Sequence, residues 1–519
     1  MCRRLVLSLV LALLLASWVQ GASIIWVSDN KGFGSVEPNT PGDQGWVDLL
    51  TAQGHTVIYK NQHEYIDGQQ YWRTLDPNKI AELEAADLII LSRNADSGSY
   101  STAADNEPNQ WNAVTTPLIS LSAHMSRTGK WGWFSSTGTV KAKEGKLKVV
   151  DPAHAVFAGV AIDPNGMVDA MSAQYYIDWV TGATNAGNGI VLATRASDGL
   201  VAIATWEAGQ KFFEGGLYTA GGPRMLFVAG TGSSNNAPNY SPDGAYNLTT
   251  AGEKMFLNAV NFMLNQGRSI VFVSSMHAST ADANVPSDRG FVDLLRAAGY
   301  DVDYTAGSVA GTGYWEGTLD PNKIAVLDEA DLIIIGRDCN SSGVANSDAQ
   351  RAVWNNAKTP IVLMSSYIAA NNRFKWLNSS SQDARKAYYD LKAVDPNHPL
   401  FAGVTLDPNN ATQWYDPNVA SGYASFINAA DAGSGKVLAV RPDNGNVLIA
   451  EWSAGQETYA GSGQIPADVR MLFNAGTQEI SGQKTNWGVM NLNAEGRKIF
   501  LNAVTHLIAP PAEEPPAAK

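Results

Sequence analysis

The sequence predicts an α/β protein made of two tandem flavodoxin-like three-layer domains with mainly parallel sheets. The first observation is an internal repeat, because the segment LDPNKI at residues 75–80 returns at residues 319–324. In both places ADLII follows after the same spacing, at residues 86–90 and 330–334. The second observation is that short apolar runs alternate with helix-period segments, which is typical of parallel strands joined by right-handed crossovers.

The repeat extends along almost the whole chain. SIIWVS matches SIVFVS, GWVDLL matches GFVDLL, DPAH matches DPNH, and FLNAV occurs in both copies, always at an offset of 243 to 246 residues. We therefore place copy one at residues 22–266 and copy two at residues 269–508. The few residues between the copies leave little room for independent movement.

The elements of copy one are predicted in order along the chain. A buried strand at residues 24–27 precedes a helix around Trp46, for which Gly54 is a plausible C′ residue. The elements that follow are a strand at 55–59, a helix at 78–85 that begins after Pro77, a strand at 88–91, a helix around Trp111 and a fourth strand at 117–121. The second half adds strands at 201–206 and 225–228 and a closing helix at 249–264, with counterparts in copy two at 447–452, 471–474 and 493–508.

Residues 1–21 read as a secretory signal peptide. Arg3 and Arg4 precede an apolar stretch at residues 5–15 that is too short to span a bilayer, and cleavage is expected near Gly21. An uncleaved membrane anchor is the alternative. No later apolar run has membrane length, so we expect no transmembrane segment in the mature chain, which would be secreted to the extracellular space or the periplasm.

The composition is acidic and poor in cysteine. The formal net charge of −13 becomes −15 without the two signal-peptide arginines, which argues against nucleic acid as a partner. Cys2 is lost with the signal, so Cys339 has no partner for an internal disulfide. Residues 509–519 form a Pro-rich tail of semi-rigid character.

Candidate ligand-binding residues follow the predicted strands, because ligands of open parallel sheets bind beyond the carboxyl ends of the strands. An Arg after the third strand and a Ser after the fourth occur in both copies. The candidates are Arg93, Ser97 and Ser122 in copy one and Arg337, Ser342 and Ser365 in copy two. A guanidinium group there could hold a carboxylate or phosphate through two hydrogen bonds, or it could instead satisfy loop carbonyls or an acidic neighbour.

The pattern resembles the class I glutamine amidotransferase-like superfamily, in particular its trehalose-utilisation (ThuA-like) branch. The resemblance is carried by the β-α-β-α-β order, by a fourth strand that ends in a small polar residue, and by the motif HxxFxGV at residues 154–160 and 398–404. It implies a nucleophilic Cys on a tight elbow after the fourth strand, with a His and a Glu later in the chain. Here Ser122 and Ser365 hold that position without the elbow glycines, and no His-x-Glu pair follows.

A serine hydrolase in copy one is an alternative hypothesis, with Ser122 and His124 as its weak catalytic candidates. Residues two apart on an extended segment face the same side, so a contact between them is conceivable, but no third member is evident. Copy two has Tyr367 in place of His124. The motif GxSxG is absent from the sequence.

Other motifs carry weaker signals. His154 and His398 are the histidines that both copies share, and each could cap a turn or bind a metal; capping is favoured, because no second ligand stands at a recognisable spacing. The loop at residues 32–34 (Gly-Phe-Gly) lacks a full phosphate-binding fingerprint. We therefore predict no metal and no cofactor.

The leading functional hypothesis is a secreted or envelope-associated binding or scaffold protein whose amidotransferase-like domains are catalytically degenerate. A protein without enzymatic activity is therefore favoured over an enzyme. Its partner would be a carbohydrate, another small polar ligand, or a protein. The alternative is a hydrolase or other enzyme that acts on a carbohydrate or small polar substrate through copy one. Convergence of Arg93, Ser122 and His124 in one open pocket would favour the alternative, whereas Trp131 or Trp133 filling that strand end would favour the scaffold.

Overall fold

The computed structural model describes most of both copies. The described residues are 21–29, 43–59, 71–102, 106–232, 244–280, 282–304, 314–386, 389–419, 424–478 and 487–508. Residues 1–20 of the expected signal peptide, the Gly-Phe-Gly loop and the Pro-rich tail lie outside these ranges. None of the helices in the described ranges is long and apolar enough to cross a bilayer.

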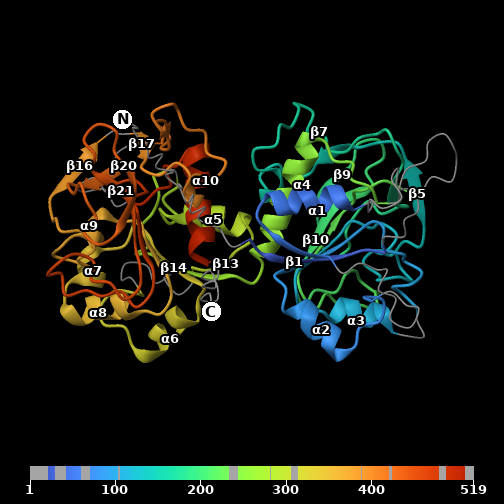
Figure 1. The fold of residues 1–519 in the computed structure, drawn as a ribbon, viewed down its shortest axis with the longest axis horizontal. Coiled ribbons are helices and arrows are strands. Elements are labelled where there is room, and N and C mark those ends of the chain that lie inside the picture. The colour runs from blue at the N-terminus through green and yellow to red at the C-terminus, as the bar shows by residue number, and fades with distance from the viewer. Residues whose placement is uncertain are drawn as a thin grey trace, which may run out of the picture.

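Each copy forms its own nine-stranded sheet with helices packed against it, and the two units lie side by side (Figure 1). The elements of copy one are β1 (Ser23–Val27), α1 (Gln44–Ala52), β2 (Thr56–Tyr59), α2 (Pro77–Glu84), β3 (Leu88–Leu91), α3 (Glu107–Ala113), β4 (Leu118–Ser120), β5 (Thr139–Ala142), β6 (Lys146–Val149), η1 (Ala155–Phe157), β7 (Met167–Asp169), β8 (Ile177–Val180), β9 (Ile190–Arg195), β10 (Val201–Trp206), β11 (Arg224–Phe227) and α4 (Thr250–Leu264).

Copy two repeats this order with one additional short helix after its third strand and another after its fourth. Its elements are β12 (Ser269–Val273), α5 (Arg289–Ala297), β13 (Asp301–Asp303), α6 (Pro321–Glu329), β14 (Leu332–Ile335), α7 (Ser341–Ala345), α8 (Asp348–Asn356), β15 (Ile361–Leu363), α9 (Ser366–Ala369), β16 (Gln382–Lys386), β17 (Asp390–Ala393), η3 (Pro399–Phe401), β18 (Ala411–Gln413), β19 (Ala424–Ile427), β20 (Lys436–Val440), β21 (Val447–Trp452), β22 (Arg470–Phe473) and α10 (Ala494–Ile508).

The sheets are mixed, so the prediction of mainly parallel sheets is wrong for half of each sheet. The order in copy one is β2-β1-β3-β4-β11-β10-β9-β6-β7, and copy two follows it strand for strand. The strands from β2 to β11 pair in parallel, whereas those from β11 to β7 pair antiparallel. A tight turn joins β9 to β10, and such a turn can connect only antiparallel strands. The expected α/β alternation therefore holds for the first half of each copy.

The helix starts follow from local chemistry. Asp76 caps α2 by accepting hydrogen bonds from the backbone N–H groups of Asn78 and Lys79, both at 2.9 Å, and Pro77 occupies the first helical position. Asp320 caps α6 in the same way through Lys323 at 3.0 Å. The repeated LDPNKI segment thus encodes a helix start, and the buried strands β3 and β14 follow it.

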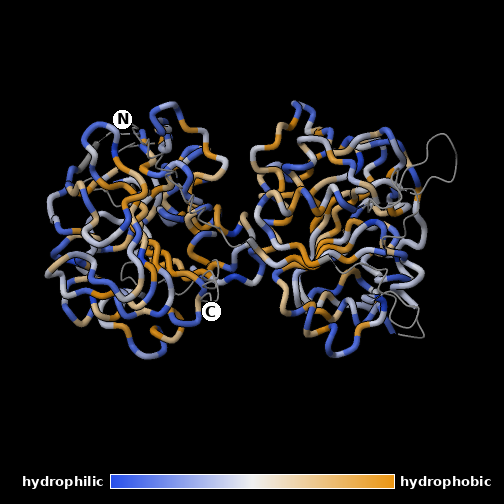
Figure 2. Tube along the Cα trace, in the orientation of Figure 1, coloured by the Kyte–Doolittle hydropathy of each residue, from blue (hydrophilic) through white to orange (hydrophobic). Residues whose placement is uncertain are grey.

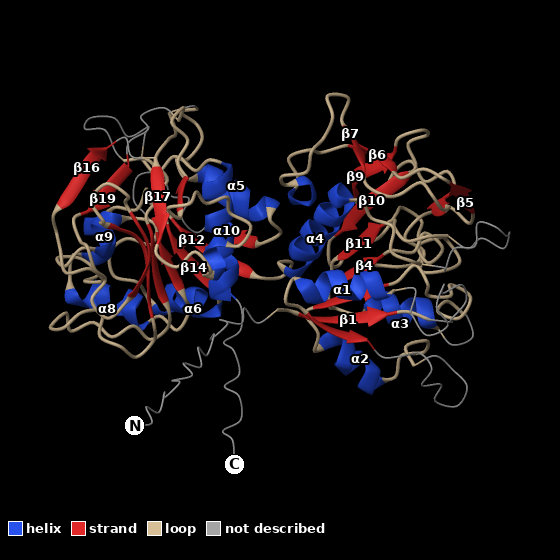
Figure 3. Cartoon of the chain, turned by 45° about the horizontal axis from the view of Figure 1, so that its top comes forward, coloured by secondary structure: helices blue, strands red, loops and turns tan. Residues whose placement is uncertain are grey.

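The core lies along the central strands, which are the most hydrophobic part of each unit (Figure 2). In copy two, α5 and α10 cover one face of the sheet, and α6 and α8 cover the other (Figure 3). Tryptophans form a large part of this core, because they are at most 1% exposed at positions 72, 111, 131, 133, 315, 354 and 376. Trp133 Nε1 donates to Asn112 Oδ1 at 3.0 Å, and Trp376 Nε1 donates to Asn355 Oδ1 at 2.9 Å, so these two pairs are equivalent.

The two units meet at the end of α4. Asn265 Nδ2 donates to the carbonyl of Ala298 at 2.8 Å, and Gln266 Nε2 donates to the carbonyl of Gly299 at 3.1 Å. Arg268 then reaches Asp87 of copy one and Asp331 of copy two, each at 3.5 Å. One linker arginine therefore contacts the same aspartate of the repeated motif in both copies.

Candidate functional site

The residues after β1, β3 and β4 lie at one edge of the sheet in copy one, since these strands pair in parallel and in order. At that edge Asp178, on β8, joins two of the predicted residues. Arg93 Nε donates to Asp178 Oδ2 at 3.0 Å, and a second guanidinium nitrogen, NH2, bonds the same oxygen. His124 Nε2 lies 3.3 Å from the other oxygen, Oδ1. The sequence analysis did not identify Asp178, because β8 was not predicted as a strand.

The carboxylate of Asp178 is buried and ionised. Burial alone would raise its pKa, but the hydrogen bond with His124 and the charge of Arg93 outweigh burial and hold the pKa of this carboxyl well below its usual range. Gly232 leaves the space that the group needs, because a Cβ atom at this position would lie 2.5 Å from Asp178 Oδ2. The Arg93 guanidinium is therefore occupied by an acidic neighbour, which is the second of the two roles considered for it.

Ser122 does not join this cluster. Its side chain is fully buried, and its hydroxyl oxygen accepts a 3.3 Å hydrogen bond from the N–H of Met125. The expectation that Ser122 and His124 face the same side of an extended segment is wrong, because residues 123–125 form a turn. The hydroxyl stabilises this turn, whose carbonyl at Ser122 also accepts the Met125 N–H at 3.2 Å.

Ser97 lies at the margin of the same region. Its hydroxyl is 3.5 Å from the NH2 nitrogen of Arg127, and Arg127 Nε donates to the carbonyl of His124 at 3.0 Å. Burial lowers the pKa of Arg127, and the charge of Asp178 opposes that effect. Arg127 therefore links Ser97 to the cluster without bringing it into contact with Arg93.

Below the edge, each copy buries an aspartate at the start of its first helix. The carboxylate of Asp43 accepts hydrogen bonds from the hydroxyls of Ser28 and Ser92, which end β1 and β3. In copy two the equivalent residue is Asp288, and Gly336 replaces Ser92. Tyr304 provides the hydroxyl that donates to Asp288 instead. The burial of these carboxylates could not be predicted, because nothing in the sequence distinguishes a buried Asp from a solvated one.

The corresponding edge of copy two has different chemistry at three neighbouring positions. Ser425 stands at the second position of β19, where β8 has Asp178, and its hydroxyl lies 3.5 Å from Gln382 Oε1. Tyr367 replaces His124, and Gln478 replaces Gly232. Gln478 Nε2 donates to the Tyr367 hydroxyl at 3.4 Å. Copy two therefore has no carboxylate at the position that joins Arg93 to His124 in copy one.

Copy two builds a different Asp–His pair from neighbouring loops. His277 Nδ1 lies 2.5 Å from Asp338 Oδ1, and the backbone N–H of His277 donates to Asp338 Oδ2 at 2.6 Å. Burial raises the pKa of Asp338, although His277 and the charge of Arg337 oppose the rise. Burial, followed by the charge of Asp338, raises the pKa of Asp288 to about 7.

The predicted residues of copy two are dispersed. Arg337 is 5% exposed, and its guanidinium lies over the ring of Tyr367, 5.1 Å from the centroid. Ser365 is fully buried, and its hydroxyl has no hydrogen-bond partner among the residues that the structure describes. Ser342 is exposed at the start of α7, where its hydroxyl donates to Asn340 Oδ1 at 2.9 Å.

The two shared histidines cap turns, as predicted. His154 Nδ1 accepts the N–H of Val156 at 3.3 Å, and His398 Nδ1 accepts the N–H of Leu400 at 3.4 Å. Within the described ranges, no group of three or more His, Cys, Asp or Glu side chains is arranged to hold a metal ion.

The bulky tryptophans do not block the strand edge of copy one. Trp131 donates to the carbonyl of Tyr100 at 3.0 Å, and Trp133 stacks on Phe212 with ring centroids 5.5 Å apart. Both belong to the buried core. The edge is instead occupied by the Arg93–Asp178–His124 cluster.

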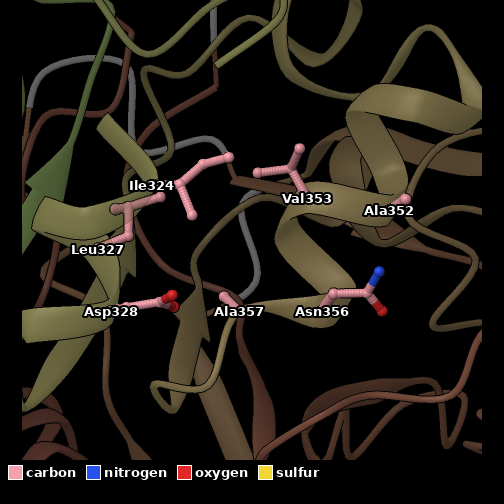
Figure 4. Close-up of a pocket in the computed structure, with 7 residues that line it drawn as sticks. All are labelled: Ile324, Leu327, Asp328, Ala352, Val353, Asn356 and Ala357. Carbon is pink, nitrogen blue, oxygen red and sulfur yellow. The ribbon is translucent and has the colours of Figure 1, made fainter. Parts of the chain in front are cut away.

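A pocket of about 260 Å³ lies elsewhere, between α6 and α8 of copy two (Figure 4). Five of its seven lining residues are apolar, and Asp328 and Asn356 supply its polar groups. Both helices end there and lead into β14 and β15, so the pocket lies at the amino end of these strands. It is thus remote from the predicted site residues.

Comparison with known proteins leaves the family open. No family model matches the chain, and no curated protein matches it. Among solved structures, the exo-beta-1,4-mannosidase Op5Man5 from Opitutaceae bacterium strain TAV5 is similar at 12% sequence identity with a TM-score of 0.22. The match covers 49% of this chain and 41% of that enzyme. The interpretation of the site therefore rests on its own geometry.

Proposed function

We propose that this chain is a secreted or envelope-associated tandem-repeat protein that binds a ligand or partner without catalysing a reaction. Its two halves, residues 22–266 and 269–508, would be degenerate amidotransferase-like domains of flavodoxin-like ancestry. The observation that carries the proposal is the state of the nucleophile position. Both Ser122 and Ser365 are fully buried, and among the residues that the structure describes neither hydroxyl has a hydrogen bond to a basic side chain.

The backbone at this position also favours a non-catalytic role. A nucleophile elbow holds its residue on a sharp, strained turn that exposes the side chain. Ser365 has φ −110°, and Ser122 also lies outside the left-handed region. An unstrained, buried serine has neither the exposure nor the base that nucleophilic attack needs.

A hydrolase in copy one remains the second candidate because of a single contact. His124 Nε2 lies 3.3 Å from the buried carboxylate of Asp178, and an acid of this kind orients a catalytic imidazole. The candidate lacks a nucleophile, since the Ser122 hydroxyl is bonded to the turn that follows it. It would need an external water molecule or a different side chain.

The test is covalent labelling of the mature chain with a fluorophosphonate, followed by peptide mass spectrometry, together with assays on glutamine, aryl esters and aryl glycosides. We expect no adduct on Ser122 or Ser365 and no turnover above the buffer rate. An adduct on Ser122 that His124→Ala abolishes would reject the non-catalytic proposal and establish the hydrolase. If turnover occurs without an adduct, and His124→Ala abolishes this turnover, the chain would be an enzyme that uses water as the nucleophile.

A further inference from the structure

The edge of copy two collects aromatic and polar side chains from several loops. His277 follows β12, Arg337 and Asp338 follow β14, and Tyr367 follows β15. Thr477 exchanges backbone hydrogen bonds with Gly488 and Val489, so the segments that carry Gln478 and Trp487 run side by side. Figure 3 shows β12 and β14 together in the sheet of copy two, where they pair in parallel. Four loop segments and the short helix α9, which carries Tyr367, therefore contribute to one cluster, which we call the copy-two edge: His277, Arg337, Asp338, Tyr367, Gln478 and Trp487.

The contacts within the copy-two edge are continuous. The ring of His277 lies against Trp487 with centroids 4.4 Å apart, while its Nδ1 contacts Asp338. Arg337 stacks on Tyr367, and Gln478 bonds the hydroxyl of Tyr367. Asp338 and Arg337 are buried, whereas Tyr367, Trp487 and His277 are partly exposed, with the imidazole 15% exposed. The buried residues thus support a surface whose exposed members are aromatic.

Some buried polar atoms of this region have no hydrogen-bond partner within the described ranges. They include the indole Nε1 of Trp487 and the hydroxyl oxygen of Ser365, two residues before Tyr367. A buried polar atom without a hydrogen bond costs free energy, so each needs an explanation. Trp487 is partly exposed, and a hydroxyl group of a ligand at its edge would supply an acceptor for the indole N–H.

The imidazole of His277 can also form a hydrogen bond with a ligand hydroxyl group. In the neutral tautomer whose Nδ1–H donates to the Asp338 carboxylate, Nε2 is a hydrogen-bond acceptor for an incoming hydroxyl. The preceding residue, Met276, has φ +55°, a left-handed conformation that is costly for a side chain of this size. Such strain persists where the surrounding structure fixes a functional side chain.

The charges of the copy-two edge favour a neutral ligand over an anionic one. The positive charge of Arg337 faces the Asp338 carboxylate and the π face of Tyr367. Asp288 lies close enough to Asp338 for the two carboxylates to repel each other. The copy-two edge therefore has no excess positive charge with which to attract a phosphate or carboxylate, and a neutral ligand fits it better.

From this arrangement we infer that the copy-two edge binds a neutral carbohydrate chain, with Trp487 and Tyr367 stacking on sugar rings and His277 accepting a hydroxyl hydrogen bond. The inference rests on the proposed non-catalytic binding function and places that function in copy two. In copy one, Asp178 already bonds Arg93 and lies 3.3 Å from His124 Nε2, and Gly232 provides no side chain. Copy one would accordingly have a structural role.

The experiment is affinity electrophoresis of the mature full-length chain through gels that contain β-glucan, galactomannan, xylan or xyloglucan. For any polymer that retards the chain, calorimetry with oligosaccharides of that polymer then measures the affinity. We expect retardation by at least one polymer. Trp487→Ala and His277→Gln should each weaken binding by 10-fold or more. Trp487→Phe, which keeps a stacking ring but removes Nε1, should weaken it less. Tyr176→Ala, at an exposed aromatic residue of copy one, is the matched control and should leave binding unchanged.

The outcomes separate this inference from the proposed function. Thermal unfolding of each variant establishes that it is folded, and Trp487→Phe is the variant least expected to disturb folding. Failure of all four neutral polymers to retard the chain overturns the inference, and so does binding that persists in Trp487→Ala and His277→Gln. Either result leaves the non-catalytic proposal standing. If a polymer retards the wild-type chain and is also cleaved by it, carbohydrate binding at the copy-two edge stands and the non-catalytic proposal is rejected.

Discussion

The two strand edges differ in chemistry although the sheets beneath them are the same. In copy one an ionised carboxylate joins an arginine and a histidine, whereas in copy two a serine, a tyrosine and a glutamine take the places of Asp178, His124 and Gly232. The three positions touch one another, so their changes are coupled: Gln478 at the site of Gly232 would meet the carboxylate of copy one. After duplication, this edge therefore diverged as a unit.

The buried residues that support the two sheets, unlike the residues of the edges, make the same contacts in both copies. Arg224 and Arg470 are fully buried and donate to equivalent carbonyls at the ends of α3 and α8, including those of Asn112 and Asn355 at 3.2 and 3.1 Å. The Trp–Asn pairs and the histidine caps are likewise the same in both copies. What the copies share is thus mainly structural, and a search for function has to begin from what they do not share.

The largest expected effect comes from removing the carboxylate that distinguishes copy one. Asp178→Asn leaves the buried guanidinium of Arg93 without its counter-charge, and breaking a buried ion pair in this way costs roughly 3–5 kcal/mol. Urea unfolding combined with hydrogen exchange of peptides from β3 and β8 measures the loss within copy one. The matched change Ser425→Ala removes only a hydroxyl and should cost less than about 1 kcal/mol. Equal effects would contradict the view that Asp178 closes the edge of copy one.

The sequence was sufficient for the first half of each fold, whereas in the second half it predicted β10, β11 and α4 but not β5 to β9. Continuous apolar runs and a capped helix start identified β1, β3 and α2, because burial on both faces and capping leave a local signature. Strands β5 and β6 have no such signature, since TVKA and KLKV carry lysines that point to solvent. Strand β5 pairs with β8 in a separate two-stranded sheet, and β6 pairs with β7 and β9. The antiparallel pairing from β11 through β10 and β9 to β6 and β7 made the large sheet mixed.

The candidate site was predicted only in part for a related reason. Arg93 and His124 were identified because both follow strands of the parallel half. Their shared partner, Asp178, lies on β8, which pairs with β5 in a separate two-stranded sheet, and its contact with Arg93 joins residues 85 positions apart. His277 and Asp338 have no counterpart pair in copy one, so the repeat that revealed the fold directed attention away from them.

The next prediction concerns Asp288, the aspartate that is buried below the edge of copy two. Asp288 has a pKa raised to about 7 by burial and by Asp338, so its neutral form is favoured in the folded state. Its contribution to stability is then full below about pH 4 and is lost as the pH rises through about 7, by roughly 2 kcal/mol or more. The free energy of unfolding of Asp288→Asn should lack this decline between about pH 4 and pH 8. Asp338→Asn removes the repelling charge and should shift the decline to lower pH. An unchanged profile in Asp288→Asn would assign the decline to other groups.

The smallest expected effect lies where the copies meet. Arg268 is 35% exposed and contacts Asp87 and Asp331 at 3.5 Å each, and ion pairs of this exposure contribute about 0–1 kcal/mol. Both carboxylates also accept the backbone N–H that starts the first strand of their own copy, at 2.8 and 2.7 Å. Arg268→Ala should therefore leave each fold intact and lower the free energy of unfolding by less than about 1 kcal/mol at low salt, with no difference at 1 M salt. Calorimetry at the two salt concentrations measures this. A loss of several kcal/mol, or one that persists at high salt, would mean that the linker arginine fixes the junction more strongly than its exposed ion pairs allow.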